Sequence, residues 1–87
     1  MIYLHHGTRA IPIRKSRKLT ANFGFFDTGK QEIVVDGRIT GEQAIEIYIH
    51  EMLHAIYPDM SEDAVADGAK AMANVLDQDE VRAQTDV

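Results

Sequence analysis

Residues 40–62 read TGEQAIEIYIHEMLHAIYPDMSE, and this stretch determines the fold. Its apolar residues recur at the spacing of one face of an α-helix. Thr40 and Gln43 match a capping box, and Pro58 disfavours helical geometry in the residue before it. The pattern therefore predicts a helix that begins after Thr40 and ends near Tyr57. Its apolar face consists of Ile45, Ile49, Met52, Leu53 and Ile56.

A second helix is predicted directly after the first. Ser61 is a favourable N-cap, and an apolar stripe follows it at helical spacing. The short connection predicts that the two helices pack together as a helical hairpin. The stripe, which we expect to be buried, consists of Val65, Ala69, Met72, Ala73 and Leu76. Residues 78–87 are polar and acidic, so we expect a flexible tail after a single domain that spans residues 1–77.

The first part of the chain has the pattern of short β-strands. Strands are expected at residues 1–4 and 10–14, and Pro12, which lacks an N–H donor, makes the second an edge strand or a strand end. Gly7 and Gly24 are expected at a turn and at a close approach of a strand.

The clearest hairpin is formed by residues 21–26 and 32–36. They flank the turn sequence Asp27-Thr28-Gly29-Lys30, in which Gly29 can adopt a positive φ. The fold class is therefore α+β, with a short hairpin or antiparallel sheet packed on the helical hairpin.

Composition excludes several classes of protein. The chain has 87 residues, 45% of them hydrophobic, and this fits one folded domain. It has no cysteine, which excludes thiolate metal sites and cysteine nucleophiles. No apolar run is long enough to cross a membrane and no secretory signal is recognisable, so we expect a cytoplasmic protein without a membrane partner.

The net charge of −5 is unevenly distributed. The second half of the chain is acidic, whereas basic residues gather near the N-terminus. No aromatic nucleic-acid-binding motif accompanies them, so we expect residues 14–18 to form a solvated loop or edge and expect no nucleic-acid partner. These basic residues are Arg9, Arg14, Lys15, Arg17 and Lys18.

Two histidines lie one helical turn apart on the first helix. His50 and His54 are at positions i and i+4, so both imidazoles can reach one Zn²⁺ ion at about 2.0–2.1 Å. Glu51 follows the first histidine and projects beside the metal, where it can take a proton from a metal-bound water. This is the chemistry of the His-Glu-x-x-His pattern. His5 and His6 alternate sides on a strand and cannot easily share a metal.

A catalytic zinc ion usually has a third protein ligand. No histidine follows His54, so this ligand must be acidic if it exists. The candidates are Asp59, Glu62, Asp63 and Asp67. Helical spacing directs Asp63 and Asp67 towards solvent and Glu62 towards the buried side, near the helix that carries the histidines. We therefore favour Glu62, with Asp59 in the connecting turn as the alternative.

Residues 50–62, HEMLHAIYPDMSE, resemble the core of the zincin metallopeptidases. More narrowly, they are similar to the gluzincins and to very small HExxH proteins of bacteriophages and bacteria. The resemblance covers residues 31–77. It implies a zinc-dependent metallopeptidase with His50 and His54 as ligands, Glu51 as general base and Glu62 as third ligand. It also implies a peptide or protein substrate and, for a phage-encoded chain, the host cytoplasm.

In such enzymes the peptide lies extended along an edge strand, here the hairpin or the strand at residues 1–4. Tyr57 is a candidate donor to the oxyanion. The alternative function is a non-catalytic binding module, a regulatory or phage accessory protein that keeps a structural or vestigial metal. Its motivation is size, because 87 residues leave little wall for a substrate cleft.

Overall fold

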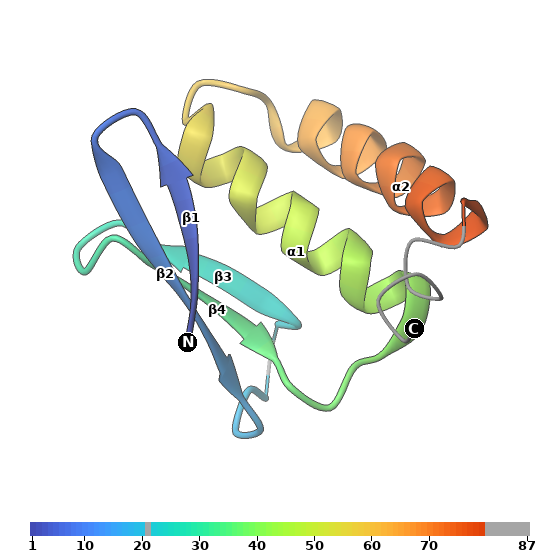
Figure 1. Cartoon of the computed structure of the whole chain (residues 1–87), viewed down its shortest axis with the longest axis horizontal. Coiled ribbons are helices and arrows are strands. Elements are labelled where there is room, and N and C mark those ends of the chain that lie inside the picture. The colour runs from blue at the N-terminus through green and yellow to red at the C-terminus, as the bar shows by residue number, and fades with distance from the viewer. Residues whose placement is uncertain (21, 80–87) are drawn as a thin grey trace.

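The computed structural model describes residues 1–20 and 22–79, and its fold is α+β, as the sequence predicted (Figure 1). The strands are β1 (Ile2–His6), β2 (Arg9–Ser16), β3 (Gly24–Asp27) and β4 (Glu32–Asp36), and the helices are α1 (Gly41–Ile56) and α2 (Glu62–Gln78). α1 packs on β3 and β4, and α2 packs on α1. In Figure 1, α1 therefore lies between the sheet and α2.

The strands form one sheet in the order β1-β2-β4-β3. Two antiparallel pairs, β1 with β2 and β3 with β4, meet at a parallel pair of β2 with β4, so the sheet is mixed rather than wholly antiparallel. β3 follows β2 in the sequence but does not pair with it. β4 lies between them, so β3 is at the sheet edge.

β2 is an interior strand, so the edge position that Pro12 indicated is wrong. Pro12 pairs with Tyr3 of β1, and pairing with β4 begins only at Ile13. Position 12 therefore needs no bond to β4, and the missing N–H is tolerated there.

The hairpin of β3 and β4 is present, but its turn differs from the prediction. Oδ1 of Asp27 accepts the N–H groups of Gly29 at 2.9 Å and Lys30 at 3.0 Å. The left-handed residue is Gln31, with φ of 54°, and not Gly29. The turn between β1 and β2 has Gly7 at φ 62°, as expected. Position 21, the predicted start of this hairpin, lies outside the described residues.

The main core lies between the sheet and α1. It contains Ile11, Ile13, Ile33, Val35 and Ala55. A second cluster joins α1 to α2, where the small side chains of Ala69 and Ala73 are fully buried against Ile49. Each buried isoleucine or valine contributes roughly 1.5–3 kcal/mol, so the sheet-facing cluster, which holds most of them, is the stronger of the two contacts of α1.

Both helices begin at the predicted residues, but only one has the predicted cap. The side chain of Ser61 accepts the N–H of Ala64 at 3.2 Å. Thr40 occupies the N-cap of α1 without a side-chain hydrogen bond, so the capping-box prediction is wrong.

The predicted apolar stripe of α2 is only partly buried. Val65, Ala69 and Ala73 are fully buried, whereas Met72 is 48% and Leu76 38% exposed. The expectation of a buried stripe is wrong for these two residues, because α2 has α1 as its main packing partner and no sheet behind it.

Arg9 connects the sheet to the first helix. Its Nη2 donates to the carbonyl oxygen of Ala55 and to Oε1 of Gln31, both at 3.2 Å, and so ties β2 to the end of α1. None of the helices in the described residues is long and apolar enough to cross a membrane. α2 extends to Gln78, and most of the predicted tail, from residue 80 onward, lies outside the described residues.

Candidate metal centre

Three side chains from two helices meet at the closed end of the helical hairpin. Nε2 of His50 lies 2.9 Å from Oε1 of Glu62, and Nε2 of His54 lies 2.8 Å from Oε2 of the same carboxylate. The centroids of the two imidazole rings are 4.9 Å apart. One ligand atom from each residue lies within 4.8 Å of the other two. The structure therefore brings together the three residues that the sequence suggested as ligands. We call His50, His54 and Glu62 the donor group.

The loop between the helices explains how Glu62 reaches the histidines. α1 ends at Ile56, and the next residues turn sharply, with the N–H of Met60 donating to the carbonyl oxygen of Tyr57 at 3.0 Å. Ser61 then caps α2, so Glu62 is its first residue. A carboxylate is favoured there by the positive end of the helix dipole.

The expectation that Glu62 faces the buried side of α2 is wrong. Its side chain is 67% exposed, and those of His50 and His54 are 23% and 27% exposed. The carboxylate reaches the imidazoles at the surface of the hairpin. The donor group is therefore open to solvent and to ligands.

The donor set fits a divalent metal ion, and zinc in particular. Two imidazole nitrogens and one carboxylate are common ligands of catalytic zinc. Bonds of about 2.0–2.1 Å place neighbouring tetrahedral ligand atoms about 3.3 Å apart. The contacts of 2.8 and 2.9 Å would have to open by a few tenths of an ångström, and the donor atoms, which lie within 4.8 Å of one another, would have to draw together by up to about 1.5 Å. His50, His54 and Glu62 could hold the ion after side-chain rotations, because all three lie at the surface of the hairpin.

Glu51 lies on the sheet side of α1, next to the donor group. It is 8% exposed, although it is charged in water at neutral pH. Burial raises the pKa of its carboxyl group, while the charges of His50 and His54 oppose this shift. Within residues 1–20 and 22–79 its carboxylate makes no hydrogen bond or ion pair. Glu51 is thus a base that the protein has not neutralised with a partner.

Gly24 makes the room that Glu51 occupies. A Cβ atom at position 24 would lie 3.0 Å from Cγ2 of Ile47, 3.0 Å from the carbonyl oxygen of Val34 and 3.4 Å from Cγ of Glu51. β3 can therefore approach α1 this closely only because residue 24 has no side chain. This confirms the close strand approach expected for Gly24.

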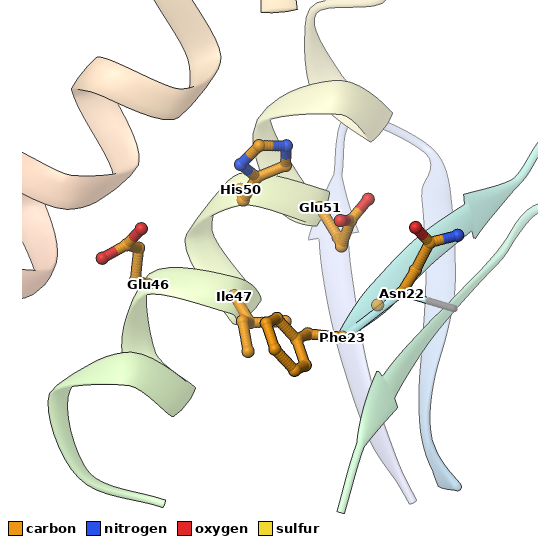
Figure 2. Close-up of a pocket in the computed structure, with 7 residues that line it drawn as sticks. Asn22, Phe23, Glu46, Ile47, His50 and Glu51 are labelled. Carbon is orange, nitrogen blue, oxygen red and sulfur yellow. The ribbon is translucent and has the colours of Figure 1, made fainter. Parts of the chain in front are cut away.

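Two adjoining pockets open beside these residues, and both are lined by Asn22, Gly24, His50 and Glu51. The larger, of about 460 Å³, extends past His54 and Glu62 to Phe25, Phe26, Thr28 and Pro58. The smaller, of about 210 Å³, is completed by Phe23, Glu46 and Ile47. Figure 2 shows this smaller pocket, with Glu46 and Asn22 on opposite sides of Ile47. Together the pockets form a groove along β3.

The groove and its donor group carry the functional interpretation by themselves. No protein-family model, curated protein or solved structure matches the chain. What the site can do therefore follows from its donor atoms, its burial and the shape of the groove.

Other candidates from the sequence lie outside the donor group. Asp59, Asp63 and Asp67 are exposed, and His5 is on β1, at the opposite edge of the sheet from β3. Tyr57 is 54% exposed and lines neither of the two pockets. Its role as an oxyanion donor stays a prediction.

Two residues that line the groove, Glu46 and Asn22, were not predicted as site residues from the sequence. Glu46 lies four residues before His50, so helical spacing alone could have placed it beside the histidines. Asn22 precedes β3, and no local signal indicates that β3 packs against the histidine-bearing helix. Its position depends on the order of strands in the sheet.

Proposed function

We propose that this chain is a zinc-dependent hydrolase of amide bonds with a peptide substrate, similar in its chemistry to the zincins. The observation that carries the proposal is the juxtaposition of Glu51 and the donor group. Glu51 is buried and lacks a partner in the described residues, and it shares both pockets with His50. The Glu51 carboxylate opens onto both pockets without a protein partner among the described residues, and burial of the residue raises its pKa, which favours a catalytic role beside potential metal ligands.

Each side chain has a distinct part in the proposed reaction. His50, His54 and Glu62 would hold the ion. A bound zinc ion would supply Lewis acidity that makes water a better nucleophile and a carbonyl a better acceptor. Glu51 accepts a proton from water and delivers it to the leaving nitrogen. Its raised pKa brings it nearer to neutrality, where a general base works best.

The free edge of β3 provides a place for the substrate. The N–H of Asp36 donates to the carbonyl oxygen of Phe23 at 2.8 Å. The backbone groups of Phe23 therefore point towards β4. In an antiparallel ladder the direction alternates, so the N–H and C=O groups of Gly24 and Phe26 point away from β4. An extended peptide could pair with them and lie along the groove. The other sheet edge, β1, is separated from β3 by two strands.

A binding module with a structural metal is the second candidate. The exposure of the donor group favours it, because Glu62 is 67% exposed and the groove is open. Such a site excludes water poorly, and water exclusion strengthens electrostatic catalysis.

The decisive experiment combines metal analysis with a hydrolysis assay. Purified chain reconstituted with zinc is expected to bind one ion and to cleave members of a peptide library, read by mass spectrometry. Glu51→Gln should retain the zinc and lose about 10²- to 10⁴-fold in rate, the usual contribution of a general base.

The matched control is Glu42→Gln, which removes the same charge from α1 at a position that lines neither pocket. If wild type and Glu51→Gln bind zinc equally and release the same background of products, the hydrolase is refuted. The binding module then remains.

A further inference from the structure

The smaller pocket has the chemistry of a side-chain subsite. Its volume of about 210 Å³ lies below the range of roughly 300–1,000 Å³ for sites that hold a whole small molecule. It adjoins the base and one metal ligand, since Glu51 and His50 line it. A pocket of this size next to the reacting centre suits one side chain of a bound peptide.

The walls of the pocket select the kind of side chain. Phe23 and Ile47 offer apolar surface, and Glu46 supplies a carboxylate at one end (Figure 2). Within the described residues Glu46 makes no hydrogen bond or ion pair. A lysine or arginine would lay its methylene stem on the apolar wall and bring its cationic head to the carboxylate. The aromatic ring of Phe23 adds a favourable surface for a cation.

We propose that Glu46 makes this pocket a subsite for a lysine or arginine adjoining the scissile bond, so that the substrates are basic peptides. This inference rests on the proposed peptidase function, which it deepens by naming the substrate class. The net charge of −5 acts in the same direction, because an acidic protein attracts cationic ligands from a distance. The neutral end of the groove, at Phe25, Phe26 and Pro58, then receives an apolar side chain.

The test measures binding, so that it does not depend on turnover. The full chain with Glu51→Gln, loaded with zinc, is titrated with fluorescent octapeptides that carry either lysine or norleucine at one position in an otherwise identical neutral background. When that position occupies the pocket, the lysine peptide should bind about fivefold tighter than the norleucine peptide. This is the effect of one charge pair at a partly exposed site. The preference should weaken as salt is raised.

Substitution of the carboxylate locates the effect. Added to this chain, Glu46→Gln should abolish the preference, and Glu46→Arg should reverse it towards glutamate peptides. Glu42→Gln, one helical turn earlier, should leave it unchanged. Thermal melts verify that each variant is folded. Equal binding of lysine and norleucine peptides, no measurable binding of either, or a preference that survives Glu46→Gln overturns the subsite.

The hydrolysis assay separates this outcome from failure of the proposed function. Cleavage that depends on Glu51 but shows no enrichment of basic residues would leave the peptidase standing without the subsite. A lysine preference in binding without any cleavage would leave a basic-peptide binding module. Where both hold, the side of the cleaved bond on which the basic residue lies reports the direction of the peptide along β3.

Discussion

Replacement of Glu62 by glutamine should weaken zinc binding far more than it weakens the fold. The side chain keeps its size but loses the charge and one of the two oxygens that contact His50 and His54 at 2.9 and 2.8 Å. Zinc sites with four protein ligands contribute about 10–16 kcal/mol, or about 2.5–4 kcal/mol for each ligand. This share corresponds to a loss of about 100- to 1,000-fold in affinity.

The same change should hardly alter the stability of the metal-free protein. The side chain of Glu62 is 67% exposed, so its contacts with the two imidazoles are worth less than about 1 kcal/mol in water. Competition against a fluorescent zinc chelator measures the affinity, and chemical denaturation in the presence of a strong chelator measures the stability of the metal-free chain. The combination distinguishes a ligand from a residue that only supports the hairpin.

Asp63→Asn is the matched control, because it removes the same charge from the next position of α2, outside the donor group. It should change the affinity less than about threefold, through long-range electrostatics alone. Two results would refute the assignment of Glu62: an affinity within threefold of wild type, or an equal loss in the control. A large loss for Asp59→Asn instead would assign the third ligand to the connecting turn.

Further perturbations test the scaffold around the site. Ser61→Ala should lower the free energy of unfolding by about 1 kcal/mol, because it removes the cap of α2, whereas Thr40→Ala should change it by less than about 0.5 kcal/mol, both read by urea denaturation. Hydrogen bonds from the side chain and backbone of Arg38 lower the pKa of Asp36 from 3.8 to about 2. Its stabilising contribution is therefore complete above pH 3.8 and is lost as the pH falls towards 2, so Asp36→Asn should be less stable than wild type near neutrality and approach it in acid, as followed by denaturation at a series of pH values. Gly24→Ala should destabilise the chain by about 1–3 kcal/mol through overpacking and reduce any hydrolysis, and normal stability and activity would show that β3 can move away.

The elements that carry local signals were predictable. Pro58 marks the end of α1, and Ser61 marks the start of α2, because each acts on the backbone within a few residues. The hairpin of β3 and β4 was equally accessible from its turn sequence. The predicted cap at Thr40 makes no side-chain hydrogen bond, and the next residue, Gly41, has a left-handed φ of 70° that the capping-box pattern does not anticipate.

The order of the strands was not predictable from these signals. β2 lies parallel to β4, although 15 residues separate the end of β2 at Ser16 from the start of β4 at Glu32. Nothing local to Pro12 indicates that pairing with β4 starts one residue later. Long-range pairing is decided by how apolar faces are shared between elements, which single-residue preferences do not encode.

Helical spacing predicted part of the donor group but not all of it. His50 and His54 were placed together by their separation of one turn, which is a local property of α1. Glu62 was chosen for the right neighbourhood but with the wrong burial, since its orientation depends on how α2 crosses α1. Glu46 obeys the same spacing as the histidines, yet its importance emerges only from Phe23 and Ile47 beside it.

A small domain can hold this site because one helix serves both the core and the groove. Ala55 packs in the core against the sheet, whereas His50 and His54 are partly exposed and line the groove along β3 with the buried Glu51 beside them. The free edge of β3 must approach Glu51 closely, which the chain achieves by omitting a side chain at Gly24. Apolar burial is limited in a chain of 87 residues, so the partial burial of the Glu51 carboxylate, which raises its pKa, lowers a stability that is already modest. Metal binding would offset it by linkage, because an ion that binds only the folded state stabilises that state. Stability and function are therefore coupled through the same turn of α1.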